Sequence, residues 1–226
     1  MVKKEKLDQF FEKYPGGYFG ILTALSGAIT ITLSSVLYYI EEPFTFFSHW
    51  ISHLGAGPNG GDIVFTIGLI ITSAFAIPFL VYLNLYLRKD MKGHKILMLE
   101  SFIASMIAIA GLIINAVWNM RDDPHLHITG STTFFFAGFF MIIFYSIWMF
   151  LSPKVPNKQA AIGLIVACIF GAFLISFIPS FEQEDLFILL TSTDPIAGIT
   201  RFIEWIVFFA VIAWFFELGV YTLKNK

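Results

Sequence analysis

The sequence predicts an all-α membrane protein: a polytopic helical bundle with six transmembrane helices, formed by a single integral-membrane domain over residues 1–226. Of the 226 residues, 57% are hydrophobic and only 13% are charged, whereas a soluble globular domain has about 25% charged residues. So few charges cannot cover the surface of a soluble protein of this size, which excludes soluble enzymes, disordered proteins and nucleic-acid binders. The single cysteine, Cys168, excludes an intrachain disulfide and a CxxC site.

Six apolar runs are long enough to cross a membrane, because a hydrocarbon core about 30 Å thick requires roughly 20 residues of helix. They cover residues 18–39, 63–87, 96–118, 128–151, 160–179 and 203–223. Pro78 lies inside the second run and predicts a kink there. Asp194 and Pro195 are typical of an N-cap and a first helical residue, so we expect the sixth helix to begin before its apolar run.

The basic residues predict the orientation. Twelve of the 14 lysines and arginines lie in the segments that share one side of the membrane with the two termini, and only Arg121 and Arg201 lie on the other side. Because lysine and arginine accumulate in cytoplasmic segments, both termini are expected to be cytoplasmic.

The first outer loop has the pattern of an amphipathic helix over residues 43–54 that lies in the membrane interface, beginning near Pro43 and ending at Gly55. Its apolar face would comprise Phe46, Phe47, Trp50, Ile51 and Leu54, and its polar face Thr45, Ser48, His49, Ser52 and His53. The second outer loop, residues 180–202, has an apolar stretch at 186–190 that we expect to reach the lipid headgroups. Trp50, Trp118 and Trp205, with Trp148 at the opposite boundary, are expected to form aromatic belts.

Polar residues occur near both predicted membrane boundaries. On the cytoplasmic side, Asn84, Glu100 and Glu217 are expected to make structural hydrogen bonds, because the outer half of the bundle has no acids that would continue a proton or ion path. On the outer side lie Asn115, Asp122 and Asp123 with four of the five histidines: His49, His53, His125 and His127. The spacing of the histidine pairs would permit zinc binding, but neither pair forms a motif such as HExxH, so we expect no metal and no cofactor. A triad of Ser52, His127 and Asp122 has no GxSxG motif to support it.

Four short motifs resemble the Frag/DRAM/Sfk family of six-helix membrane proteins. They are residues 51–56 (Ile-Ser-His-Leu-Gly-Ala) followed by Pro58, Phe65 and Gly68; His127-x-x-Gly130-Ser131; Phe135 with Tyr145; and Glu204-Trp205. A related prokaryotic family of unknown function has a similar Ser-acid-Leu-Gly-Ala signature. The chain departs from both at His53, where these families usually have Asp or Glu, which puts in doubt any chemistry that needs that acid.

The resemblance implies a role in membrane-lipid biology, since eukaryotic members include a GPI-anchor remodelling protein of the Golgi, lysosomal autophagy modulators and partners of phosphoinositide kinase complexes. No reaction is common to these members. The first hypothesis is that the protein binds or handles membrane lipid in a polar pocket open to the outer leaflet, with Arg201 suited to an anionic phosphate. The candidate lipid-binding residues are Ser52, His53, Asn115, His127, Arg201, Glu204 and Trp205.

Three alternatives remain at the level of the sequence. The protein would be an intramembrane lipid hydrolase or acyl-transfer enzyme if His127 acts as a general base that Glu204 orients. It would be a scaffold or chaperone if its partner is another membrane protein. Arg201 and Glu204, three residues apart on one helix, would in the simplest case only pair with each other.

Overall fold

Six long helices form the bundle, and each is apolar and long enough to cross a membrane. A computed structural model describes residues 6–88, 95–177 and 195–225. The six helices are α2 (Gly16–Glu41), α3 (Gly61–Arg88), α4 (Lys95–Val117), α5 (Pro124–Leu151), α6 (Asn157–Phe177) and α8 (Pro195–Lys224). The prediction of an all-α protein with six membrane spans is confirmed, and the chain is an integral multi-pass membrane protein.

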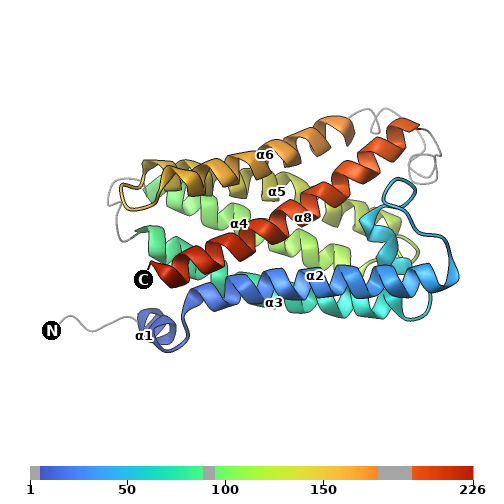
Figure 1. The fold of residues 1–226 in the computed structure, drawn as a ribbon, viewed down its shortest axis with the longest axis horizontal. Helices are drawn as coiled ribbons and strands as arrows, with labels where there is room; N and C mark the ends of the chain where they lie inside the picture. The colour runs from blue at the N-terminus through green and yellow to red at the C-terminus, as the bar shows by residue number, and fades with distance from the viewer. Residues whose placement is uncertain (1–5, 89–94, 178–194, 226) are drawn as a thin grey trace.

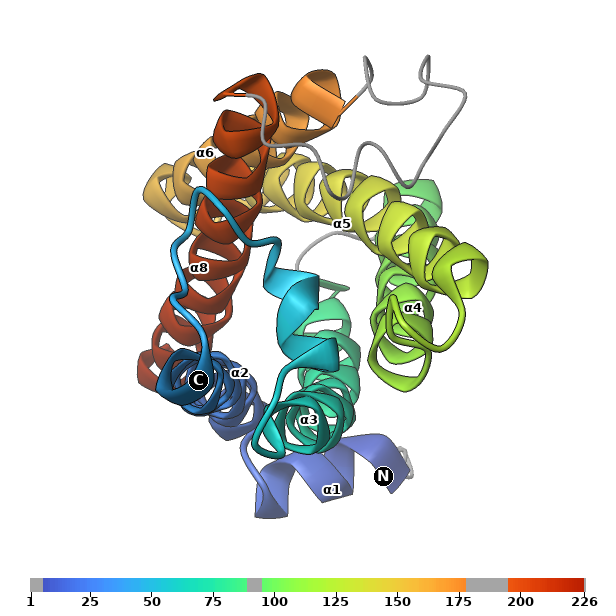
Figure 2. The ribbon, with the colours of Figure 1, turned by 90° about the vertical axis from the view of Figure 1, so that its right-hand side faces the viewer.

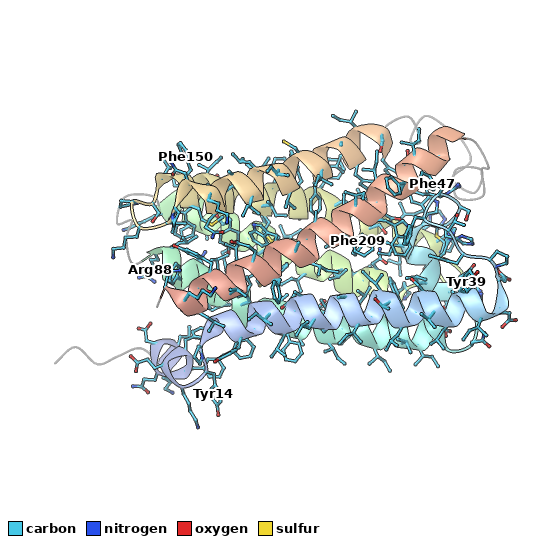
Figure 3. The ribbon with its side chains drawn as sticks, in the orientation of Figure 1. Tyr14, Tyr39, Phe47, Arg88, Phe150 and Phe209 are labelled. Atoms are coloured by element: carbon cyan, nitrogen blue, oxygen red, sulfur yellow. The ribbon has the colours of Figure 1, made fainter. Side chains whose placement is uncertain are left out.

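The helices form a closed ring. Each long helix packs against its neighbour in the chain, and α8 closes the ring by packing against both α6 and α2 (Figure 2). Both termini lie at one end of the bundle, which we call the terminal end; the opposite end, which carries Tyr39 and Phe47, is called the loop end (Figures 1 and 3). Short connections make consecutive helices antiparallel, and an even number of such helices places both termini at the same end.

The outward-facing side chains are large and apolar. Exposed residues include Ile29, Leu33, Ile67, Ile107, Phe140 and Ile165, which come from five different helices. Inside the ring, small residues permit close approach: Thr30 lies directly against Gly68, and Ser146 lies directly against Gly163. Because lipid tails replace water around such a bundle, an apolar exterior and close contacts at small residues are the expected packing.

Helix boundaries depart from the apolar runs where capping residues extend them. Asp123 accepts a hydrogen bond from the Leu126 backbone N–H (3.0 Å) and Pro124 follows it, so α5 begins four residues before its predicted span. α8 begins at Pro195, as the sequence predicted. α3 continues as one helix through Pro78. A short helix that the sequence did not reveal, α1 (Lys6–Lys13), packs its Phe11 ring on Tyr82, with 5.1 Å between ring centroids.

The predicted interfacial helix at 43–54 is wrong. The segment instead turns at Thr45–His49 and then forms a 3-10 helix, η1 (Ile51–Ala56), which contacts α2, α3 and α8 at the loop end of the ring (Figure 2). The predicted polar face does not point to solvent as a whole, because Ser52 is buried together with Ile51, Leu54 and Gly55. Amphipathic spacing predicts a surface helix only when nothing in the bundle competes for the segment, and here α8 does.

The aromatic-belt prediction is wrong for three of the four tryptophans. Trp50, Trp148 and Trp205 are each at most 3% exposed and lie inside the bundle, whereas Trp118 is 39% exposed. The apolar stretch predicted at 186–190 in the second outer loop lies outside the described residues.

Candidate functional site

A cavity of about 40 Å³ opens at the loop end between α5, α6, α8 and η1. Its polar lining residues are Ser52, His127, Ser131, Thr132 and Glu204, and its aromatic lining residues are Trp50, Phe135, Phe136, Phe173 and Phe177. Three of the seven candidate residues from the sequence, Ser52, His127 and Glu204, therefore meet in one cavity although they come from three separate elements. We call this space the outer cavity.

His127 occupies the first turn of α5 and is 3% exposed. Its Nδ1 lies 3.0 Å from the backbone carbonyl oxygen of Trp118 at the end of α4. A carbonyl only accepts, so Nδ1 carries the proton and Nε2 of the neutral ring is left as a hydrogen-bond acceptor. The imidazole is thus oriented by the backbone of a neighbouring helix.

Glu204 is 5% exposed and holds η1 in place. Its Oε2 accepts a hydrogen bond from the buried backbone N–H of Ile51 at 2.8 Å. One residue further, the Trp205 indole Nε1 donates to the His49 carbonyl oxygen at 2.9 Å. These two bonds from α8 fix the path of the first outer loop, so Trp205 supports the outer cavity from outside it.

Asn115 contributes through Ser131, which lines the outer cavity. The Asn115 Nδ2 donates to the Ser131 hydroxyl across the α4–α5 interface. At the same crossing, Gly111 and Gly130 bring the two helix backbones into direct contact. The sequence contained Ser131 and Thr132 but gave them no role; the available signal was that they follow His127 by about one helical turn, which places them on the same face.

Arg201 does not line the outer cavity. Its guanidinium lies over the Trp50 ring, 5.5 Å from the centroid, and its Nη1 donates to the Phe47 carbonyl oxygen at 3.5 Å. The sequence-based role for Arg201, binding a phosphate headgroup, is therefore not supported by its position. The positive charge of Arg201, one helical turn from Glu204, interacts favourably with the charged form of the Glu204 carboxylate.

His53 lies beside His49, with 5.7 Å between the ring centroids. Burial lowers the pKa of His53 to about 4, and the neighbouring His49 and Arg201 lower it further in the same direction. Burial also lowers the pKa of His49. Within the described residues, no three His, Cys, Asp or Glu side chains are grouped so as to hold a metal ion.

The other polar residues singled out in the sequence lie apart from the outer cavity. Asp122 is exposed and accepts a hydrogen bond from Asn119 Nδ2 (2.7 Å), so it does not complete a triad with Ser52 and His127. At the terminal end, Glu217 Oε1 accepts from Gln159 Nε2 at 2.7 Å, and Asn84 Nδ2 donates to the Met98 carbonyl oxygen at 3.0 Å. Glu100 is exposed on α4.

A second cavity, of about 60 Å³, lies in the middle of the ring and is lined by apolar surface alone. All six long helices contribute to it, with Leu69, Ala108, Met141 and Ile212 among the lining residues. We call this space the central cavity. Five phenylalanine rings separate the two cavities: Phe134, Phe135, Phe170, Phe173 and Phe208, with neighbouring centroids 4.2–6.3 Å apart.

Residues 21–221, nearly the whole chain, match the family described as Protein of unknown function (DUF998). The chain belongs to this family. No curated protein and no solved structure shows significant similarity to this DUF998 member. The matched region contains all six long helices in whole or in greater part, and every residue of the outer cavity. The resemblance to the Frag/DRAM/Sfk family is not tested by this match and stays a prediction.

Proposed function

We propose that this protein binds or handles a membrane lipid, with the polar end of the lipid in the outer cavity. The observation that supports the proposal is the pairing of two spaces: one with polar groups at the loop end and one wholly apolar in the middle of the ring. An amphiphile has the same division between head and tail. Ligand pockets are concave and mostly apolar with a few placed polar groups, which describes the outer cavity well.

The access route follows from the residues at the cavity wall. Phe136 on α5 is 45% exposed on the outside of the bundle and also lines the outer cavity. A lipid entering between α5 and α6 would pass this ring and reach His127 without crossing the helix ring. With both termini in the cytoplasm, as the basic residues predict, this route opens to the outer leaflet.

The phenylalanine cluster is the suggested tail contact. Its rings form the boundary between the polar wall and the central cavity, so an acyl chain would meet aromatic surface as soon as it leaves the headgroup site. Rotation of these rings would change the boundary between the two cavities without moving a helix.

Lipid copurification tests this proposal. The full chain is purified in a mild detergent and its bound lipids are quantified by mass spectrometry for the wild type, His127→Ala and His125→Ala. His125 is exposed on the same helix, two residues from His127, and serves as the matched control. We expect retained lipid to fall for His127→Ala and to be unchanged for His125→Ala.

Glu217→Gln at the terminal end is a second control, because Glu217 hydrogen-bonds to Gln159 far along α8 from the outer cavity. It is expected to keep its lipid. Equal lipid retention in all four proteins would reject the outer cavity as a lipid site and favour a scaffold that binds another membrane protein. Loss of lipid in Glu217→Gln alone would indicate that the lipid site lies at the terminal end, contrary to our proposal.

The same cavity supports a second candidate function, an intramembrane lipid hydrolase or acyl-transfer enzyme. Ser52 and His127 both line it, and the hydrogen bond of Nδ1 to Trp118 leaves Nε2 as the basic nitrogen. Such an imidazole is in the form that a general base requires. Labelling of the wild type with a fluorophosphonate probe, absent from Ser52→Ala, would favour the enzyme; wild-type protein that resists the probe while binding lipid would favour a binding role alone.

A further inference from the structure

The polar side chains of the outer cavity present mainly hydrogen-bond acceptors, which narrows the class of lipid that would fit. This inference rests on the lipid-binding function proposed above. Glu204 Oε2 is held by the Ile51 N–H, while Oε1 has no hydrogen-bond partner within the described part of the chain. His127 Nδ1 is engaged by Trp118, which leaves Nε2 as an acceptor. The two most polar side chains of the cavity therefore both present acceptors to a ligand.

No lysine or arginine of the described segments lines the outer cavity. The nearest candidate from the sequence, Arg201, has its guanidinium over the Trp50 ring and bonded to the Phe47 carbonyl oxygen. The Trp50 indole N–H is enclosed by protein and is not reached from the cavity. An anionic phosphate in the outer cavity would thus meet the Glu204 carboxylate with no lysine or arginine of the described segments in the cavity wall, and a buried charge that no group contacts is strongly unfavourable.

The remaining polar groups are hydroxyls, which serve as either donor or acceptor. Ser52, Ser131 and Thr132 line the same cavity as the two acceptors, and their hydroxyls are available to a ligand hydroxyl or amine. The volume of about 40 Å³ is more than the minimum needed to hold one water-sized group, so the cavity has room for a small polar group.

We propose that the outer cavity takes a lipid whose polar end is a small hydrogen-bond donor, a hydroxyl or an ammonium group, and that it discriminates against a phosphate headgroup. The donor hydrogen bonds to Glu204 Oε1 and to His127 Nε2, and the hydrocarbon chain lies along the phenylalanine cluster. Monoacylglycerols and long-chain amines have this chemistry.

Binding of three probes with the same oleyl-type chain tests the proposal: 1-oleoylglycerol, oleylamine and 1-oleoyl-lysophosphatidic acid. Each is titrated against the full detergent-purified chain, and occupancy is measured by native mass spectrometry. We expect the wild type to bind at least one donor lipid about tenfold more tightly than lysophosphatidic acid, the contribution of one hydrogen bond to a charged group. The donor lipid that binds more tightly shows whether the cavity prefers a hydroxyl or an ammonium group.

Glu204→Gln is the diagnostic variant, because its amide oxygen still accepts the Ile51 N–H while the charge is lost. It should weaken oleylamine about tenfold and leave lysophosphatidic acid binding equal or tighter. Glu100→Gln, an exposed acid at the terminal end, is the matched control and should change neither. The ranking in the wild type tests the ligand class even if Glu204→Gln does not fold.

The outcomes separate the two levels of the argument. Tightest binding of lysophosphatidic acid by the wild type overturns the donor-lipid class but keeps the lipid-binding function. Unchanged oleylamine binding in a folded Glu204→Gln overturns the role given to Glu204. Failure of all three probes to bind overturns the proposed function itself.

Discussion

A single added methyl group should destabilise the α4–α5 crossing, because there two helix backbones touch at glycines. A Cβ on Gly111 would lie 2.5 Å from the Phe134 backbone nitrogen and 2.8 Å from the Gly130 carbonyl oxygen. Both are backbone atoms and cannot rotate away as a side chain would. To reach an ordinary contact of 3.4 Å, α4 and α5 must separate by about 0.9 Å.

Gly27→Ala is the matched comparison, since a Cβ at Gly27 meets nothing closer than 3.5 Å. The gain of up to about 1 kcal/mol in helix propensity is common to both substitutions and cancels in the comparison. What remains is the cost of overpacking at Gly111, about 1–3 kcal/mol. For a chain of this length, that difference corresponds to a Tm lower by roughly 3–9 °C for Gly111→Ala than for Gly27→Ala.

Thermal unfolding in detergent, followed by helical circular dichroism, measures the difference directly. Retained lipid should fall as well, because separating the helices lengthens the hydrogen bonds from Asn115 to Ser131 and from His127 to Trp118. Equal Tm values for the two alanine variants would refute the argument that the α4 and α5 backbones are in direct contact at this crossing.

Three further predictions concern the loop end and the orientation. Glu204→Ala should lower the free energy of unfolding by about 1–3 kcal/mol relative to Glu204→Gln, because only alanine leaves a buried N–H of η1 without an acceptor; equal stability would contradict the anchoring role. Because the folded-state pKa of His53 is about 4, below its value of about 6.5 in the unfolded chain, stability should be fully present above pH 6.5 and decline as the pH falls toward 4. His53→Gln should reduce that decline and leave the part due to His49, whose pKa burial also lowers; an unchanged pH profile would contradict this. In a Cys168→Ser background, a membrane-impermeant thiol reagent added outside cells should modify a cysteine introduced at Asn59 and not one at Lys92; the reverse pattern would invert the orientation.

The helices could be predicted because each is a local property of the sequence. A run of about 20 apolar residues has one low-energy solution in a membrane, a helix with all its backbone hydrogen bonds satisfied internally. Capping chemistry is equally local, so the early start of the last helix at Pro195 could be predicted. The early start of α5 was missed although Asp123 and Pro124 carry the same signal.

The first outer loop could not be predicted, because its conformation is set by residues about 150 positions away. The Ile51 N–H is satisfied by Glu204, and the His49 carbonyl is satisfied by Trp205. Periodicity within residues 43–54 contains no information about these partners. The same limit applies to Arg201, whose position over the Trp50 ring is a tertiary contact. From the sequence alone, a basic residue at a membrane boundary suggested a binding site for a phosphate headgroup.

The meeting of His127 and Glu204 is an intermediate case. Both lie near the loop-end boundary of their helices, so their depth could be predicted from helix rise alone. Their lateral proximity depends on the ring order, in which α5 and α8 both pack on α6. The depth of both residues could therefore be predicted, whereas packing brought them to one cavity, where each hydrogen-bonds to a backbone group rather than to the other.

The two membrane-embedded glutamates of α8 differ in what their charge can do. Glu217 faces Gln159, and its second oxygen is enclosed by protein. Glu204 uses one oxygen to anchor η1, a task that glutamine would perform equally well, and presents the other to a cavity. A buried carboxylate costs free energy that an amide does not. Anchoring η1 therefore gives no reason for an acid rather than an amide at position 204, whereas the nearby Arg201 charge and a ligand with a donor group in the outer cavity each do.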